Sequence, residues 1–543
     1  MFFHRLTTLL FFIWILNLLN VTFSKSGNEI FSSTTELEKL FKHESEVVKK
    51  LEEYALAMET NLLVIKRYID DFNMIRKEGP TESSEVVANP VNAFHILKRT
   101  TVDWEDVLNS IKNHTKTDGL VDEVVRKGAY LPTFEDFIGG SMALVGLQDT
   151  YKLNLSDIIQ GSIGEGSNTR RSPYELTARD CLFLGKAAFN KGLYDRAVGW
   201  LETALSRADE EALISSAPAT ASKEEILPFL ETTRRVHDEV LEKRGPSGDT
   251  WQTFPTPLNP SLAKKKKYQK VSTYKPRIFD PLSEAEELEN FKTLCREEEL
   301  RNPELDAPLR CRLRRRPGTK SFLGPFKVEE KSLEPYIILI HDFMLESEIN
   351  AYKSISSSRL RRSLHQGKGG GYVATDVRTS KQAWLTMDDD PAVDEFTKRI
   401  GELTGLEMFP ENEASEVYQV ANYGMAGRYN PHTDYITGQD HLSEPFEQLR
   451  GNRIATFMAY LENVHAGGST VFPLTGVRVK PQKGAGVFWW NLRSDGSGDP
   501  LTRHGGCPVL YGEKWITNKW IRYNAQFQKV LCVPKGSEFI QEI

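Results

Sequence analysis

Apart from its first two dozen residues, the sequence lacks any apolar run long enough to span a membrane. It also lacks a basic excess, because 69 Lys and Arg residues are balanced by 75 Asp and Glu residues, for a net charge of −6. A balanced chain gives no compositional sign of nucleic-acid binding. We therefore expect no stable membrane span and no nucleic-acid partner. At 543 residues, the chain is long enough for roughly two to four domains.

The one apolar run covers residues 9–19 and follows His4 and Arg5, with small and polar residues after it. This order is typical of a secretory signal peptide, which we place at residues 1–25. An uncleaved anchor over residues 6–23 is the alternative, although two asparagines inside that stretch favour cleavage.

Cysteine is scarce, with five residues in the chain. In the oxidising compartment that a signal peptide implies, cysteines usually pair. We expect the pairs that are nearest in sequence, Cys295–Cys311 and Cys507–Cys532, to form local disulfides, with Cys181 as a free thiol. In the same compartment the sequons at Asn113 and Asn154 are candidate glycosylation sites.

Apolar residues recur with spacing three and four from Leu37 to Ile75, and no glycine or proline interrupts them before Gly79-Pro80. This pattern predicts one long helix with a coiled-coil seam. We therefore expect residues 26–145 to be a helical, coiled-coil dimerisation region. The alternative is that the seam packs against the chain's own next helices.

Residues 180–205 have the pattern of one helix-turn-helix repeat of tetratricopeptide type. A single repeat cannot bury its own face, so neighbouring helices must cover it. Grooves of this kind often hold extended peptides, and we assign residues 146–245 to a tetratricopeptide-like, peptide-binding domain. A plain helical spacer is the alternative.

After residue 245 the composition turns to Pro, Lys, Thr and Ser, and we expect residues 246–330 to be a linker with a local disulfide. The remainder consists of short apolar or alternating runs separated by Gly, Asn and Pro, at 336–340, 417–423, 454–461, 470–472, 485–490 and 514–523. These runs predict a double-stranded β-helix (jelly-roll) domain over residues 331–535. The fold class is therefore multidomain, with an all-α N-terminal half followed by a jelly-roll catalytic domain.

His432 and Asp434 are two residues apart in an extended segment, so their side chains share one face. A second histidine must come from another strand, and His504 is the strongest candidate. Two histidines and one carboxylate on one side of an octahedral iron leave three positions open, which accept a bidentate 2-oxo acid and dioxygen.

Lys514 follows His504 on the next apolar run. An ammonium at the closed end of a barrel can pair with the distal carboxylate of 2-oxoglutarate. Burial would lower the pKa of this lysine, so the anion is needed to keep it charged. A solvated strand lysine is the alternative, but the neighbouring Trp515 and Trp520 favour burial.

Several long motifs together identify a resemblance to the α subunits of collagen prolyl 4-hydroxylase, and the likeness extends over nearly the whole chain. The motifs are Gln419-Val-Ala-Asn-Tyr-Gly, His432-x-Asp434, Gly451-Asn-Arg-Ile-Ala-Thr-Phe-Met-Ala-Tyr-Leu, Ala466-Gly-Gly-Ser-Thr-Val-Phe-Pro, Gly486-Val-Phe-Trp-Trp-Asn-Leu and Arg503-His-Gly-Gly-Cys-Pro-Val-Leu-Tyr-Gly-Glu-Lys-Trp-Ile-Thr-Asn-Lys-Trp.

The resemblance implies an enzyme that hydroxylates C4 of proline in X-Pro-Gly sequences of collagen-like chains. It would use O2, 2-oxoglutarate and Fe(II), with L-ascorbate to rescue oxidised iron. The implied roles are distributed as follows: His432, Asp434 and His504 as iron ligands, Lys514 as the 2-oxoglutarate anchor, Thr470 and Tyr423 in the co-substrate pocket, and Tyr429, Arg453 and Trp520 as contacts of the substrate proline.

The family's α subunits pair with protein disulfide isomerase, the β subunit, in an α2β2 tetramer of the endoplasmic reticulum lumen, and the resemblance implies the same here. The sequence departs from the family at Arg522, where vertebrate collagen enzymes have a histidine that assists the binding and decarboxylation of 2-oxoglutarate. We expect Arg522 to donate to the same carboxylate of 2-oxoglutarate as that histidine, and to alter the affinity for this co-substrate. Residues 229–240 also contain no tyrosine, which puts tight binding of long proline-rich chains in question.

Two other functions remain open from the sequence. One is an oxygenase with another substrate, either a lysyl hydroxylase or a prolyl enzyme acting on a non-collagen protein. The other is a catalytically silent peptide-binding or chaperone subunit, although binding alone would not require the three metal-ligand candidates together with Lys514.

Overall fold

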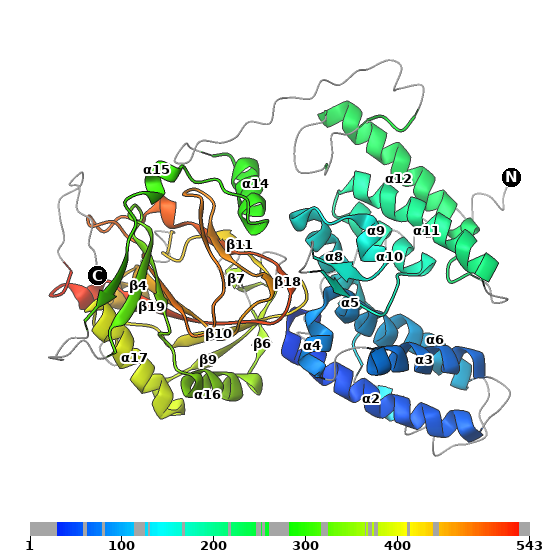
Figure 1. Cartoon of the computed structure of the whole chain (residues 1–543), viewed down its shortest axis with the longest axis horizontal. Coiled ribbons are helices and arrows are strands. Elements are labelled where there is room, and N and C mark those ends of the chain that lie inside the picture. The colour runs from blue at the N-terminus through cyan, green and yellow to red at the C-terminus, as the bar shows by residue number, and fades with distance from the viewer. Residues whose placement is uncertain are drawn as a thin grey trace.

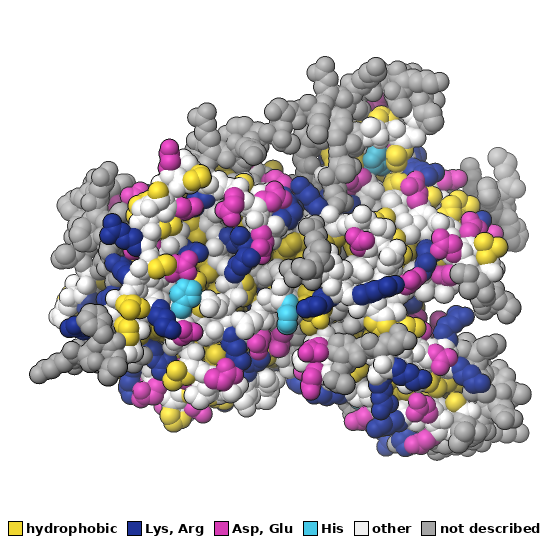
Figure 2. Space-filling view, in the orientation of Figure 1, with side chains coloured by type: hydrophobic (Ala, Val, Ile, Leu, Met, Phe, Trp, Pro, Cys, Tyr) yellow, Lys and Arg dark blue, Asp and Glu magenta, His cyan; other side chains and the backbone are white. Residues whose placement is uncertain are grey.

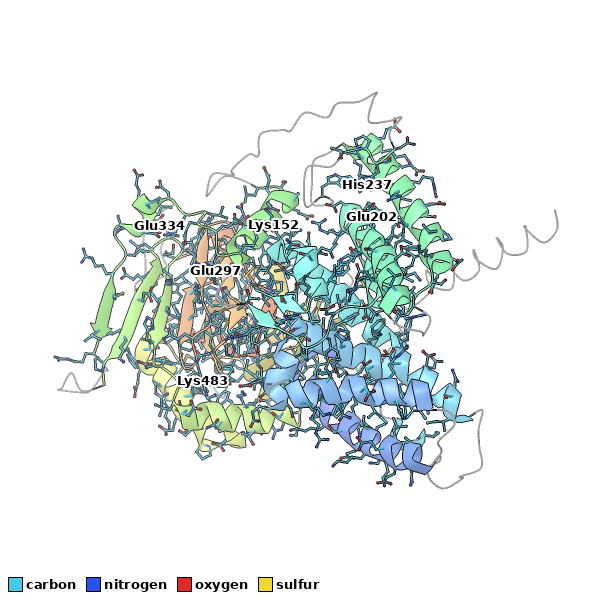
Figure 3. All side chains as sticks on the ribbon, turned by 45° about the vertical axis from the view of Figure 1, so that its right-hand side comes forward. Lys152, Glu202, His237, Glu297, Glu334 and Lys483 are labelled. Carbon is cyan, nitrogen blue, oxygen red and sulfur yellow. A yellow bond between two sulfur atoms is a disulfide. The ribbon has the colours of Figure 1, made fainter. Side chains whose placement is uncertain are left out.

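The computed structural model describes residues 30–57, 62–78, 82–112, 125–128, 131–164, 169–214, 219–245, 251, 256–259, 282–315, 324–363, 365–366, 372–373, 378–409, 413–437 and 445–530. Figure 1 shows a helical half built from the N-terminal part of the chain beside a sheet-rich region built from the C-terminal part. Figure 3 shows the same division from another side, with Glu202 and His237 on the helices and Glu334 and Lys483 with the sheets. The expected order of a helical half and a sheet-rich half is confirmed.

The first group of helices packs around two apolar clusters. Its members are α2 (Thr34–Ala57), α3 (Leu62–Glu78), α4 (Ser83–Ala88), α5 (Pro90–Lys98), α6 (Trp104–Lys112), α8 (Phe134–Tyr151) and α9 (Leu155–Ile159). A five-residue π-helix, Arg99–Asp103, joins α5 to α6. The start of α5 is fixed by Asn89, whose side chain accepts from the Val91 amide, and by Pro90 in the first turn.

The predicted single long helix is wrong, because α2 and α3 are separate helices that pack against each other. Val47 and Leu51 of α2 share a buried cluster with Tyr68 and Phe72 of α3. The Tyr68 hydroxyl also donates to Glu44. The apolar seam is therefore covered within the chain, as the alternative proposed, and dimerisation through this region stays a prediction.

Three longer helices follow, α10 (Ala178–Asn190), α11 (Tyr194–Ile214) and α12 (Lys223–Arg244). Ala188 and Leu201 are fully buried between α10 and α11. Gly185 allows this close packing, since a Cβ there would lie 2.7 Å from Leu201 Cγ. A pair of packed helices is thus found where the repeat was expected, while the tetratricopeptide-like assignment and peptide binding stay predictions.

The sheet-rich region is built on a nine-stranded sheet with the order β3-β4-β5-β16-β12-β19-β10-β9-β6. Its strands are β3 (Cys311–Arg314), β4 (Phe326–Ser332), β5 (Ile337–His341), β6 (Arg361–Arg362), β9 (Lys381–Leu385), β10 (Tyr418–Tyr423), β12 (Arg453–Tyr460), β16 (Gly486–Trp490) and β19 (Lys514–Arg522). The predicted strands at 336–340, 417–423, 454–461, 485–490 and 514–523 are confirmed to within one residue.

A second sheet has four strands in the order β11-β17-β14-β15. They are β11 (Tyr429–His432), β17 (His504–Gly506), β14 (Thr470–Phe472) and β15 (Val477–Val479). Phe472 and Val479 of this sheet share a buried cluster with Met458 and Trp489 of the nine-stranded sheet. The two sheets therefore face each other across one core, as expected for a jelly-roll.

Two helices, α16 (Glu346–Ser357) and α17 (Pro391–Thr404), cover the other face of the nine-stranded sheet. Tyr352 of α16 and Phe396 of α17 are buried against Tyr418 of β10. The Arg399–Glu348 ion pair joins the two helices.

The described part of the predicted linker is structured. It forms α14 (Glu284–Cys295), α15 (Pro303–Asp306), β3 and the start of β4. Phe291 and Leu294 of α14 pack on Val471 of β14. Apolar residues in α14 thus bind this segment to the jelly-roll, so a linker over the whole of 246–330 is wrong.

Both predicted disulfide pairings are wrong, because Cys295 is bonded to Cys507, with Cα atoms 5.4 Å apart. Cys295 ends α14 in the buried cluster that also contains Cys507, whereas Cys311 is exposed on the edge strand β3. Cys181 is a free thiol, as predicted, and the structure places it in a buried position. Cys532 lies outside the described residues.

Within the described part of the chain, no helix is long and apolar enough to cross a membrane. The predicted signal peptide and Asn113 lie outside that part. Asn154 is exposed at the start of α9, where its side chain accepts from the Ser156 amide. Acidic and basic side chains are interspersed over the face shown in Figure 2.

Candidate metal and co-substrate site

Two histidines and one carboxylate meet at the four-stranded sheet. Strands β11 and β17 pair antiparallel with His432 and His504 in register, and Asp434 follows β11. His432 Nε2 lies 3.6 Å from Asp434 Oδ1, and His504 Nε2 lies 3.7 Å from Asp434 Oδ2. All three ligand atoms lie within 4.8 Å of one another. The structure therefore brings the three predicted metal ligands to one point.

Hydrogen bonds behind these side chains orient them. His432 Nδ1 lies 2.9 Å from the Asn430 carbonyl and His504 Nδ1 lies 3.0 Å from the Thr502 carbonyl. Because a carbonyl can only accept, each Nδ1 carries the proton and each Nε2 keeps its lone pair for a metal.

The carboxylate is held from its other side. Thr456 Oγ1 donates to Asp434 Oδ2 at 2.7 Å, and Asn491 Nδ2 donates to Thr456 Oγ1 at 2.8 Å. Sequence reasoning missed Thr456 and Asn491. In the sequence the two residues differ from their neighbours only in being polar: Thr456 lies within an otherwise apolar strand, and Asn491 directly follows another.

Burial controls the charges of the site. Burial alone would raise the pKa of Asp434, but the adjacent His504 and His432 hold that pKa well below its usual value. Burial lowers the pKa of His504 to about 4. Near neutral pH His504 is therefore an uncharged imidazole beside a carboxylate, which is the donor set that suits a ferrous ion.

Lys514 is buried on β19 with 1% of its surface exposed. Its register partner is Tyr423 of β10, and Nζ lies 5.0 Å from the Tyr423 ring centroid. Burial lowers the pKa of Lys514 to about 7. Among the described residues, no carboxylate contributes to this shift of the Lys514 pKa. A buried cation in this state fits an anionic ligand such as 2-oxoglutarate.

Thr470 lies on the strand that pairs with the strand of His504. It lies on β14, in register with Gly506 of β17, and its hydroxyl accepts from Tyr460 at 2.8 Å. A Cβ at Gly506 would lie 3.4 Å from Lys514 Nζ. Thr470, Tyr423 and Lys514 thus lie around the same part of the barrel, and their roles in a co-substrate pocket stay predictions.

The three predicted substrate contacts lie at the metal ligands. The Tyr429 ring stacks on His432 with centroids 3.6 Å apart. Arg453 Cζ lies 4.0 Å from the Trp520 ring centroid, and its NH1 donates to the Asp434 carbonyl at 3.3 Å. These side chains form one rim beside the candidate metal site.

Two further charged side chains, which sequence reasoning missed, hold this rim. Glu416 accepts from Arg453 through both carboxylate oxygens, at 2.6 and 2.9 Å. Arg378 Cζ lies 4.8 Å from the Tyr429 ring centroid, and its NH2 donates to Gln419. Nothing in their local sequence marks either residue, because their partners come from other strands.

Arg522 is engaged by acidic side chains, and its expected contact with the co-substrate carboxylate stays a prediction. Arg522 is at the opposite end of β19 from Lys514, a span of roughly 26 Å at the usual rise of a strand. Its guanidinium pairs with Glu416 at 2.9 Å and with Glu447 of α19 (Pro445–Arg450). It also donates to the Gly451 carbonyl. Acidic partners near the rim therefore engage this arginine.

Comparison with known proteins gives two family matches. Residues 33–165 match the prolyl 4-hydroxylase alpha-subunit, N-terminal region, and residues 418–522 match the 2OG-Fe(II) oxygenase superfamily. The second match contains all three metal-ligand candidates and Lys514.

Full-length relatives agree with these matches. The chain is 34% identical to prolyl 4-hydroxylase subunit alpha-2 of Gallus gallus, over 94% of this chain and 95% of the relative. It is 33% identical to subunit alpha-1 of Rattus norvegicus, over 91% and 94%, and 33% identical to subunit alpha-2 of Caenorhabditis elegans, over 92% of each. Among solved structures, a viral collagen prolyl hydroxylase from Paramecium Bursaria Chlorella virus-1 is 26% identical over 34% of this chain and 95% of its own, with a TM-score of 0.27. On the identity and coverage of the full-length relatives, the chain belongs to the prolyl 4-hydroxylase alpha-subunit family.

Proposed function

We propose that this chain is the catalytic subunit of a prolyl 4-hydroxylase that acts on X-Pro-Gly sequences of collagen-like polypeptides. The observation that carries the proposal is the meeting of His432, Asp434 and His504 at one point of the same barrel that buries Lys514. A silent peptide-binding subunit would have no use for this combination. A lysyl hydroxylase is disfavoured because the family members matched over most of the chain are prolyl enzymes.

His432, Asp434 and His504 would hold Fe(II), which together with 2-oxoglutarate and O2 supplies the oxidation of an unactivated C–H bond. The Nδ1 hydrogen bonds keep both imidazoles aimed at the ion, and Thr456 fixes the carboxylate. Lys514 binds the distal carboxylate of 2-oxoglutarate, with Tyr423 and Thr470 beside it. L-Ascorbate would complete the cofactor set as the reductant that keeps the iron ferrous.

Aromatic side chains keep water from the reacting centre. The Trp489 and Phe472 ring centroids lie 4.7 and 5.5 Å from that of His504. Both rings are buried, so this side of the candidate metal site is apolar and would limit side reactions with solvent.

The substrate proline would lie along the rim formed by Tyr429, Arg453 and Trp520. Arg453 is fixed by Glu416 and by the Asp434 carbonyl, so it presents its face to Trp520 in one orientation. A pyrrolidine ring packs well on such flat surfaces, and a fixed rim places its C4 toward the metal site.

The helical half would supply a second contact for the long substrate. On α10 and α12, the half-buried Phe189 and Phe229 have ring centroids 5.5 Å apart, and Lys186 Nζ lies 5.7 Å from the Phe229 ring. Proline-rich chains dock on exposed aromatic rings because their extended helix is ordered before binding. These phenylalanines offset the absence of tyrosine from residues 229–240 and support a peptide-binding role for residues 146–245.

The proposed assembly is an α2β2 tetramer with protein disulfide isomerase as the β subunit, in the endoplasmic reticulum lumen. The signal-like residues 1–25 and the disulfide between Cys295 and Cys507 support a secretory location.

The test is a turnover assay of the chain co-expressed with protein disulfide isomerase. A (Pro-Pro-Gly) repeat peptide is supplied with Fe(II), ascorbate and carboxyl-labelled 2-oxoglutarate. Release of labelled carbon dioxide together with 4-hydroxyproline is expected. Hydroxylysine formed from a collagen-like lysine peptide would support the lysyl alternative, and no product from any proline-rich or lysine peptide would support the silent subunit.

A further inference from the structure

The N-terminal end of the helical half is inserted against the strand that leads to Tyr423. The Gly424 amide donates to the Ser32 carbonyl at 3.1 Å, and the Met425 amide donates to the Phe31 carbonyl at 3.0 Å. A Cβ at Gly424 would collide with the Phe31 carbonyl, so only glycine permits this approach. Residues just before α2 therefore pair with the chain of the catalytic region.

A buried amide lies at the centre of this junction. Asn422 is fully buried, and its Oδ1 accepts from Ser33 Oγ at 2.5 Å. Its Nδ2 donates to Thr34 Oγ1 at 2.8 Å and lies 3.3 Å from Glu513 Oε1. The Thr34 hydroxyl is also 3.0 Å from that Glu513 oxygen. The helical half thus supplies two partners of this buried amide, Ser33 and Thr34, beside Glu513 of the catalytic region.

The junction lies directly behind the proposed co-substrate pocket. Asn422 precedes Tyr423, and Glu513 precedes Lys514, while Tyr423 and Lys514 are register partners. Successive side chains of a strand point to opposite faces. The amide and the carboxylate are therefore held on the outer face, while Tyr423 and Lys514 are directed inward.

The segment that joins His504 to Lys514 is attached to helices at three more points. Cys507 is bonded to Cys295 of α14, the Tyr151 hydroxyl of α8 donates to the Pro508 carbonyl, and the Gly512 amide donates to the Ala88 carbonyl of α4. Two of these three contacts come from α8 and α4 of the helical half, so the position of Lys514 depends in part on that half.

We propose that Asn422 and Thr34 are positioning residues, through which the helical half sets the place of the Lys514 ammonium and hence the affinity for a 2-oxo dicarboxylate. This rests on the proposed function, since it takes the ligand of Lys514 to be that dicarboxylate. In consequence, α2 is a structural part of the co-substrate pocket as well as of the helical core.

The test uses Thr34→Val, which keeps the shape of the side chain and removes its hydroxyl. Thr34→Ser restores the hydroxyl, and Ser45→Ala is a matched control on the same helix, where the hydroxyl donates to the Phe41 carbonyl. The full chain is loaded with Mn(II), and calorimetry measures its dissociation constants for 2-oxoglutarate and for Mn(II). Thermal unfolding of each variant is recorded in parallel.

Thr34→Val is expected to weaken 2-oxoglutarate binding about tenfold while Mn(II) affinity stays within about twofold, because a buried amide loses one partner. Thr34→Ser should bind 2-oxoglutarate as tightly as the parent chain does.

The inference is overturned if Thr34→Val binds 2-oxoglutarate as tightly as Ser45→Ala, or if the affinities for 2-oxoglutarate and Mn(II) fall together. Should Thr34→Val fail to fold, Glu513→Ala must show the same selective loss. A parent chain that binds Mn(II) but no 2-oxoglutarate would instead reject the proposed function.

Discussion

His432 and His504 face each other as register partners of two antiparallel strands, with ring centroids 4.5 Å apart. Their Nδ1 atoms each lie at a backbone carbonyl two residues earlier. The same local device thus orients two ligands that are far apart in the sequence. Backbone pairing holds the imidazoles together before any metal binds. Differences in metal affinity should therefore come from smaller contacts, namely the hydrogen bonds that orient the three ligand side chains.

Thr456→Val tests those smaller contacts. The substitution removes the hydrogen bond to Asp434 Oδ2 and leaves all three ligands in place. Metal affinity is expected to fall by about 10- to 100-fold, as for other residues that orient a ligand. Titration with Fe(II) under anaerobic conditions measures it. Thr233→Val in α12, where a hydroxyl within the helix is lost, is the control, and equal affinities in the two variants would contradict the role of Thr456.

Lys514 should make 2-oxoglutarate binding depend on pH. Its pKa in the free protein is lowered to about 7 by burial, so the ammonium is present below pH 7 and lost above it. Affinity should be constant below about pH 7 and weaken as pH rises from 7 to 9, with proton uptake on binding. Calorimetry in buffers of different ionisation enthalpy detects that uptake.

The same pKa affects stability without ligand. A lysine whose pKa is depressed on folding binds fewer protons in the folded than in the unfolded chain between about pH 7 and its ordinary value of 10.5. Its contribution to the free energy of unfolding therefore rises with pH across that window. In Lys514→Arg, whose side chain stays charged, neither the affinity for 2-oxoglutarate nor the free energy of unfolding should show this dependence on pH. If the affinity of that variant still falls with pH as in the parent chain, Lys514 is not the source of the dependence.

Arg522 should affect the peptide and not the co-substrate. Its partners Glu416 and Glu447 lie at the rim, and Glu416 also holds Arg453. A lysine cannot pair with both carboxylates as the guanidinium does. Arg522→Lys is therefore expected to raise the KM for a proline-rich peptide several-fold, with little change in the KM for 2-oxoglutarate. Arg493→Lys is the control, because Arg493 is exposed and pairs with Asp499, away from Glu416 and Glu447. A rise confined to the KM for 2-oxoglutarate would support the role first expected from the sequence.

The disulfide gives a prediction about stability. Cys507→Ser removes the bond that ties α14 to the segment after His504 and should lower the free energy of unfolding by about 2–5 kcal/mol. Denaturant unfolding measures the change, with Cys311→Ser as the control because that thiol is exposed and free. Non-reducing peptide mapping should recover a Cys295–Cys507 peptide, and recovery of Cys295–Cys311 in its place would disprove the pairing.

Features that follow from the spacing of residues close together in the sequence were predictable. The strands of the barrel alternate or are wholly apolar, so the strand found as Tyr418–Tyr423 was expected almost to the residue. The candidate metal ligands His432 and Asp434 were found because they share a face by spacing alone. His504 and Lys514 were candidates from their positions on the later strands, and the resemblance to a known family implied the same residues.

Features set by distant contacts were not predictable. The seam from Leu37 to Ile75 has the same spacing whether one helix continues or two helices fold together. The partner of Cys295 is Cys507, at a sequence separation of 212, because α14 packs on β14 and brings the sulfur atoms together. Arg522 was expected at the co-substrate since a family histidine occupies that position, but its contacts depend on Glu447 of α19. Local pattern carries no information on such pairs.

The most direct test of the central claim compares the parent chain with His432→Ala, each co-expressed with protein disulfide isomerase. Carbon dioxide release from 2-oxoglutarate is measured with a (Pro-Pro-Gly) repeat peptide, and binding of the same peptide is measured separately. We predict that His432→Ala abolishes turnover while peptide binding by residues 146–245 persists. Retention of most of the turnover by His432→Ala would contradict the assignment of His432, Asp434 and His504 as the iron site.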